Sequence, residues 1–129
     1  MPDDPMVLHP PHYGAQRFGI ECIEFARCMM FLPGSAFACV WRCEENGNPV
    51  QDLEKARTYW NWAWESGESL CRASHRNTLS MLYFRHLEPK VDTDWMAALL
   101  GDMIWENWDS AAEKIDARHE FFVLNGGRP

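Results

Sequence analysis

The chain has 129 residues, of which 47% are hydrophobic and seven are tryptophan, so it is long enough to bury a core as one domain. Its formal net charge of −7 excludes a general DNA or RNA binder, because phosphate binding needs a basic surface. No apolar run approaches the roughly 18 residues of a membrane span, and five cysteines without a CxxC pair favour a reducing cytoplasm.

Apolar residues recur at helical spacing through the first half of the chain. Residues 19–30 predict a first helix, and residues 32–45 predict a second with Ser35 as its N-cap after a Pro-Gly pair. The NGNP turn follows, in which Asn48 suits an N-cap and the proline suits the first helical position. A third helix is therefore predicted from about residue 49 to residue 66.

Three further helices are predicted after Gly67. They comprise residues 68–89 ended by Pro89, residues 94–108 capped by Thr93, and residues 111–122 capped by Ser110. Strand signals are almost absent, so we expect an all-α, compact single domain of five to six short helices. Residues 1–7 and 125–129 are expected to be loose ends.

Charge is distributed unevenly along the chain. From Asp92 onward, eight acids stand against Lys114, Arg118 and Arg128. Residues 69–90 have the opposite balance, with four basic residues and Glu88 as the acid. An anionic ligand is therefore expected on the middle of the chain.

Arg72, His75 and Arg76 are the best candidates for an anion site. Their spacing of i, i+3 and i+4 places them on one face of a helix. Groups so placed could clamp a phosphate, an acidic partner segment or the acidic half of a second copy of this chain. The alternative is a solvated face that neighbouring acids balance.

Arg42 follows an apolar run directly, and Asp52 comes just after the next turn. In one interpretation the guanidinium reaches Asp52, or a glutamate of the first helix, and fixes how the first three helices pack. In the other, Arg42 points into a cleft in which Trp41 or Tyr59 offers a ring for base stacking.

Glu21 and Glu24 are three residues apart and share a helix face, from which they could hold a Mg²⁺ ion carrying nucleotide phosphates. This arrangement resembles half of the site in MazG-like all-α nucleotide pyrophosphohydrolases, where an ExxE helix faces a later ExxD helix. The alternative is a solvated face that holds no metal. The candidates for the second half lie far along the chain: Glu106 with Asp109, and Glu113 with Asp116.

Trp60, Trp62 and Trp64 alternate along the third predicted helix. Helix neighbours two residues apart point to different sides, so the three rings cannot all enter one core. At least one ring is expected at an interface with a ligand, a partner helix or a second subunit. A homo-oligomer is the simplest explanation.

Other metal and nucleophile sets are incomplete. His9 and His12 would need two further ligands to bind Zn²⁺, so packing of a histidine beside Tyr13 is the favoured interpretation. No cysteine lies beside an obvious base, and no Ser-His-Asp order stands out.

An ordered set of short motifs lies between residues 9 and 66: His12-Tyr13, Gly19-Ile20-Glu21, Ile23-Glu24, Gly34, Ala36, Trp41-Arg42, Asp52-Leu53, Lys55-Ala56 and Tyr59. This order resembles a small bacteriophage family of unknown function, whose members are often labelled "nucleotide kinase". The chain departs from the family at Ala38-Cys39, where Lys-Tyr is usual, and at Glu44 and Glu45, where basic residues are usual. Residues 67–124 form a helical extension without a match. A kinase is excluded, because no GxxxxGK[ST] motif follows a strand.

The resemblance implies a phage-encoded accessory protein in the cytoplasm of the host cell. The residues independently indicate an acidic helical binder that needs no cofactor. Together they predict a counter-defence or host-takeover protein that acts stoichiometrically on a nucleotide-type ligand or a host protein. The ligand-binding candidates are Arg42, Tyr59, Arg72, His75 and Arg76, and the interface candidates are Trp60, Trp62 and Trp64. The alternative is a MazG-like, Mg²⁺-dependent nucleoside triphosphate pyrophosphohydrolase with Glu21 and Glu24 as catalytic and metal-binding residues.

Overall fold

The structure is a computed structural model that describes residues 17–129. Within this range it contains helices and no strand, so the predicted all-α class is confirmed. The α-helices are α2 (Cys22–Ala26), α3 (Phe31–Arg42), α4 (Pro49–Ser66), α5 (Arg76–Leu82), α6 (Trp95–Ile104) and α7 (Trp108–Leu124). The described residues also contain the short 3₁₀ segments η2 (Ala73–His75) and η4 (Glu88–Lys90) and the π-helix η3 (Tyr83–Leu87).

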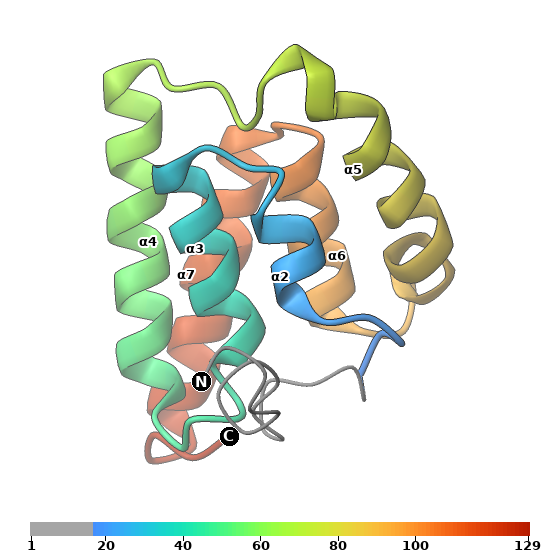
Figure 1. Ribbon diagram of the computed structural model, residues 1–129. Coiled ribbons are helices and arrows are strands. Elements are labelled where there is room, and N and C mark those ends of the chain that lie inside the picture. Colours follow the sequence, from blue (N-terminus) through green and yellow to red (C-terminus); the bar gives the residue numbers. More distant parts are fainter. Residues whose placement is uncertain (1–16) are drawn as a thin grey trace, which may run out of the picture.

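Four helices surround the core. Helix α4 packs against α3 and α7, and α6 packs against the same two helices, so the four contacts close a ring. Figure 1 shows α3, α4 and α7 running side by side, with α2 beside α3 and α5 at the edge of the molecule. None of the helices within residues 17–129 combines the length and apolarity that a membrane crossing needs.

Aromatic side chains fill much of the interior. Phe25, Phe37 and Trp41 form a cluster with ring centroids 5.4 to 6.0 Å apart, which joins α2 to α3. Trp60 of α4 is 1% exposed, and its indole Nε1 donates a hydrogen bond of 3.1 Å to the carbonyl of Trp108 in α7. Each such buried ring contributes roughly 1.5 to 3 kcal/mol through the apolar surface it removes from water.

The limits predicted for the third helix are those of α4. The Asn48 side chain accepts a hydrogen bond from the backbone N–H of Gln51 at 3.2 Å, and Pro49 occupies the first helical position. Gly67 ends the helix with a φ of +69°, in the left-handed region that glycine adopts without strain. Local signals decide both ends of this helix.

The start of α3 corrects the prediction for Ser35. The helix begins at Phe31, so Ser35 lies inside it and does not cap it. Pro33 and Gly34 occupy the first turn, because a first-turn proline needs no N–H partner within the helix. The preceding helix is also shorter than predicted, since α2 ends at Ala26.

The predicted caps of the last two helices are wrong as well. Asp94, and not Thr93, caps α6 by accepting a hydrogen bond of 2.9 Å from the N–H of Met96. Ser110 lies within α7, where its hydroxyl donates to Asp102 Oδ2 at 2.6 Å. An aspartate one residue later competes with threonine as a cap, and the sequence alone does not separate the two.

The predicted fourth helix, residues 68–89, is broken in the structure. Residues 68–72 are not helical, and η2, α5, η3 and η4 follow in turn. Leu70 is fully buried, and its carbonyl accepts a hydrogen bond of 2.7 Å from the N–H of Met30. This long-range bond holds the non-helical segment against the start of α3.

Candidate anion-binding site

A surface pocket of about 270 Å³ lies where α2, the start of α3 and the segment before α5 meet. Two of the predicted ligand-binding residues, Arg72 and His75, line this pocket, and Arg27 joins them. No carboxylate lines it among residues 17–129. The full lining is Arg27, Cys28, Met29, Met30, Phe31, Arg72 and His75.

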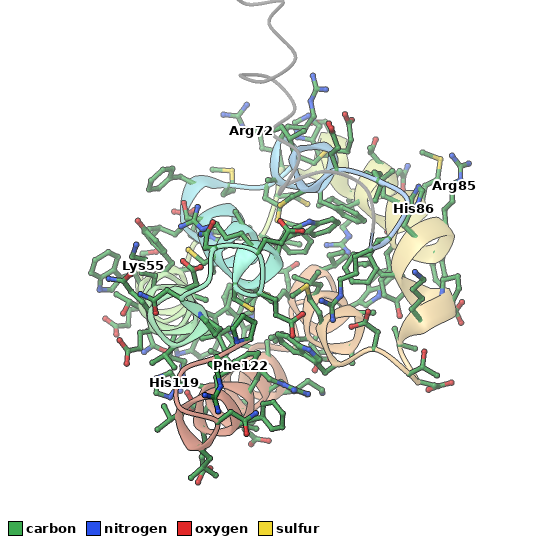
Figure 2. All side chains as sticks on the ribbon, turned by 90° about the horizontal axis from the view of Figure 1, so that it is seen from below. Lys55, Arg72, Arg85, His86, His119 and Phe122 are labelled. Atoms are coloured by element: carbon green, nitrogen blue, oxygen red, sulfur yellow. The ribbon has the colours of Figure 1, made fainter. Side chains whose placement is uncertain are left out.

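Two hydrogen bonds bring the parts of this pocket together. The N–H of Met30 donates to the carbonyl of Leu70, and the N–H of Leu32 donates to Glu68 Oε1 at 3.0 Å. Both bonds tie residues 68–70 to the start of α3, so Arg72 arrives beside that helix end. In Figure 2, Arg72 lies near α2, on the opposite side of the molecule from His119 of α7.

The start of α3 leaves one backbone N–H group free beside the pocket. This helix has 12 residues, and its N-cap residue Met30 makes no side-chain capping bond. The N–H of Phe31 has no hydrogen-bond partner within residues 17–129. A free N–H group and the helix dipole favour an anion at such an end, where the Glu68 carboxylate already accepts the hydrogen bond of Leu32.

The basic side chains of the pocket are available to a ligand. Arg72 is exposed and His75 half-buried, and neither side chain has an ion-pair or hydrogen-bond partner in the described part of the chain. Arg27 is 67% exposed and forms an ion pair with Glu24 of α2 at 3.8 Å, which is longer than a hydrogen bond and open to solvent, so an anionic ligand can compete with it. The two guanidinium groups and the imidazole can therefore rotate toward an anion in the pocket, beside the free N–H of Phe31.

Arg76 does not belong to this pocket, contrary to the expectation that it shares a face with Arg72. Its Nη2 donates a hydrogen bond of 2.8 Å to the carbonyl of Ile104, and its guanidinium carbon lies 4.9 Å from the ring centroid of Trp105. Arg76 therefore caps the end of α6. The residues before it are non-helical or 3₁₀, so the spacing of an α-helix does not apply to them.

Of the two interpretations of Arg42, the structure shows the one in which its guanidinium lies beside Asp52 and joins two helices. Its Nε lies 3.5 Å from Asp52 Oδ1, and its Nη2 lies 3.3 Å from the Sγ of Cys39. Asp52 is 4% exposed and also accepts a hydrogen bond from Asn46 Nδ2 at 3.1 Å. The pair joins the end of α3 to the start of α4, and the buried Trp41 offers no ring face for stacking.

Tyr59 does not line the pocket, but it contacts Phe31, which does. Its ring meets the ring of Phe31 edge-on at 6.3 Å between centroids, and the ring of Trp62 at 5.8 Å. Phe31 is 73% exposed and lines the pocket. We call Phe31, Tyr59 and Trp62 the aromatic surface.

The three tryptophans of α4 do not all enter the core, as expected from their spacing. Trp60 is buried against Trp108 with ring centroids 4.1 Å apart, so its ring is not available at the surface to a partner, contrary to the prediction. Trp62 and Trp64 are 51% and 63% exposed. These two rings are the ones available to a partner.

The two glutamates of the enzyme hypothesis lie at the start of α2, a short α-helix. Glu21 is the N-cap residue of α2, and Glu24 lies inside this helix of five residues. Within residues 17–129, no group of three or more His, Cys, Asp or Glu side chains is placed to hold a metal ion. Two of the proposed second-half acids are paired: Glu106 lies 3.8 Å from Arg76, and Asp116 lies 2.9 Å from Arg57.

The cysteines within residues 17–129 are unpaired. Burial raises the pKa of Cys22 and of Cys43 to about 12, so both thiols are protonated at neutral pH. His9, His12 and Tyr13 lie outside the described residues, and their packing stays a prediction.

Sequence reasoning missed Arg27 and Phe31 as site residues. Arg27 lies within the first predicted helix and Phe31 between the first two predicted helices, where no local signal marks either as a site residue. No family model, curated protein or solved structure matches this chain. The pocket is therefore interpreted from its own chemistry.

Proposed function

We propose that this protein acts stoichiometrically by binding a small phosphate-bearing ligand of nucleotide type in the pocket of Arg27, Arg72 and His75. The observation that supports this proposal is the convergence of three basic side chains and the N-terminus of α3 on a pocket without acids. In the phage accessory role that the bacteriophage resemblance implies, such binding would withdraw a host signalling nucleotide and so counter host defence.

The geometry suggests how the ligand would be held. A phosphate would accept charge-assisted hydrogen bonds from the two guanidinium groups and a further bond from the N–H of Phe31. The exposed ring of Phe31 would pack against the base or sugar, with Tyr59 supporting it edge-on. The acidic remainder of the protein would disfavour long polyanions, which fits a small ligand better than nucleic acid.

Calorimetric titration tests this proposal with ATP, ADP, cyclic AMP and inorganic phosphate as probes. Charge-assisted hydrogen bonds contribute about 1.5 to 3 kcal/mol each, so Arg27→Ala and Arg72→Ala should each raise Kd by about 10-fold to 100-fold. Arg85→Ala is the matched control, because Arg85 is exposed and lies outside the pocket (Figure 2). Absence of binding to all four probes, or equal loss in the control, would contradict the proposal.

The enzyme alternative makes a different prediction for the same protein. With Mg²⁺ and a nucleoside triphosphate, a MazG-like enzyme would release pyrophosphate, and Glu21→Gln with Glu24→Gln would abolish this turnover. A binder would return the intact nucleotide after heat denaturation, and the same double variant would still bind it. Anion-exchange chromatography of the recovered nucleotide separates the two outcomes.

A host protein is the second candidate target. The exposed rings of Phe31 and Trp62 on the aromatic surface favour this candidate, since contiguous exposed aromatic groups are typical of protein interfaces. A protein partner would require Trp62 and would not require Arg72. Comparing Trp62→Gln with Arg72→Ala in a phage infection assay would therefore distinguish a protein target from a small ligand.

A further inference from the structure

A second pocket, of about 300 Å³, lies between α6 and α7. It shares no lining residue with the pocket of Arg72, and α7 lies on the other side of the molecule from Arg72 in Figure 2. Small side chains leave room between larger rings. The lining residues are Trp95, Ala98, Lys114, Ala117, Arg118 and Phe121.

Arg118 makes cation–π contacts with two aromatic rings of this pocket. Its guanidinium carbon lies 4.4 Å from the ring centroid of Trp95 and 4.5 Å from that of Phe121. Cation–π contacts of this kind restrain the guanidinium and leave its N–H groups free to bind another partner. Within residues 17–129, Arg118 forms no ion pair and no side-chain hydrogen bond.

The nearby acids are occupied by other cations. Asp94 accepts hydrogen bonds of 2.7 and 2.9 Å from Arg17, which also pairs with Glu44. The other cation that lines the pocket, Lys114, lies 2.5 Å from Asp102 Oδ2. In the described part of the chain, Arg118 is therefore the lining cation without an acid partner. Burial lowers the pKa of Arg118 and outweighs the opposite effect of Glu44 and Asp94, in keeping with its half-buried position.

We propose that the pocket between α6 and α7 binds a small monoanion with a flat apolar body, such as an aromatic carboxylate. The carboxylate bonds to the N–H edge of Arg118, and the body packs along Trp95 and Phe121 above the two alanines. This site is independent of the nucleotide-type site.

The chemistry of the lining selects this class of ligand. One unpaired cation matches one negative charge, whereas a nucleotide brings several charges that this pocket would leave unpaired. The rest of the lining is largely aromatic or aliphatic, which suits an apolar body. A volume of about 300 Å³ corresponds to roughly ten water molecules at about 30 Å³ each, which is the size of a bicyclic aromatic acid.

Binding of 2-naphthoate by the full chain tests the proposal, with 2-naphthamide as the neutral probe of the same shape. Calorimetric titration should show saturable binding of the acid with a Kd at least tenfold lower than that of the amide. The side-chain indole N–H resonance of Trp95, assigned with Trp95→Phe, should shift on addition of the acid. Saturable binding with no shift of this resonance would place the acid elsewhere and overturn the proposal.

Two variants separate charge from shape. Arg118→Gln should bring the Kd of 2-naphthoate to that of 2-naphthamide, and Ala117→Leu, at an exposed position, should weaken both probes at least tenfold by filling the pocket. Arg72→Ala should leave both Kd values unchanged, because Arg72 lines the other pocket. No binding of 2-naphthoate by the native chain, or equal binding by Arg118→Gln, would overturn the proposal.

Discussion

At the scale of single residues, charged side chains join segments that are distant in the sequence. Arg17 binds Asp94 at the start of α6 and Glu44 after the end of α3. Burial alone would lower the pKa of Arg17, but hydrogen bonds from its guanidinium to these two acids raise it. Because both acids are partly buried, these contacts resist screening better than exposed ion pairs do.

Asp102 provides a pH-dependent contribution to stability. Burial alone would raise its pKa, but hydrogen bonds from Lys114, Ser110 and Asn107 hold the pKa below its ordinary value. As the pH falls below about 4, the unfolded chain binds the proton first, so the stabilisation present above that pH is lost. Urea unfolding between about pH 6 and pH 3 should therefore show a smaller acid loss in Asp102→Asn than in the native protein.

Asp109→Asn is the control for this measurement, because Asp109 is exposed in the first turn of α7. Its acid loss should equal that of the native protein. If Asp102→Asn also lost stability as steeply as the native chain, the hydrogen bonds to Asp102 would not account for the acid sensitivity.

At the scale of elements, the packing of η3 on α6 depends on one glycine. A Cβ atom on Gly101 would lie 2.9 Å from Cε1 of Tyr83, which is closer than van der Waals contact allows. The Tyr83 ring also contacts Trp105 at 5.3 Å between centroids. The π-helix Tyr83–Leu87 and the left-handed φ of +57° at Glu106 lie beside this contact. The absence of a side chain at Gly101 lets the two elements approach.

Gly101→Ala should destabilise the native fold despite the better helix propensity of alanine. Overpacking costs about 1 to 3 kcal/mol, whereas replacing a mid-helix glycine by alanine contributes about 1 kcal/mol. A net loss of about 1 kcal/mol in the free energy of unfolding is therefore expected in urea titration. In a Tyr83→Ala background the ring is gone, so the same substitution should become stabilising. Stabilisation by Gly101→Ala in the native background would contradict the close contact.

At the scale of the whole molecule, apolar association and net charge oppose each other. The aromatic surface leaves Phe31 and Trp62 exposed, which favours association between copies. The net charge of −7 repels a second copy at low ionic strength. Salt should therefore promote self-association, because it screens the repulsion and leaves the apolar contact intact.

Sedimentation equilibrium at about 100 μM protein should show an average mass above that of a monomer. The average mass should be higher in 0.5 M than in 0.05 M NaCl, because the screening length falls from about 14 Å at 0.05 M to about 4 Å at 0.5 M. Trp62→Gln should shift the protein toward monomer by about tenfold in Kd. Phe84→Gln is the matched control, since this exposed ring belongs to η3 and lies outside the aromatic surface. A native protein that stays monomeric at both salt concentrations would exclude this oligomer.

Local signals account for the parts of the fold that the sequence predicted. The helical period, the Asn48 cap and the Gly67 stop act within a few residues, so the all-α class and the limits of α4 could be predicted. The ion pair of Arg42 and Asp52 was one of two stated alternatives, and it spans one short turn. The competing caps at Thr93 and Asp94 show the limit of such signals.

The sequence by itself determined the helical class, the acidic charge with its basic middle segment, and the surplus of tryptophans that one helix cannot bury. The tertiary structure alone decided which basic residues meet. The bonds from Met30 to Leu70 and from Leu32 to Glu68 bring Arg72 and His75 to Arg27, while the carbonyl of Ile104 draws Arg76 away. The physical reason is that these partners are far apart in sequence, so their meeting depends on how whole helices pack and not on any local preference.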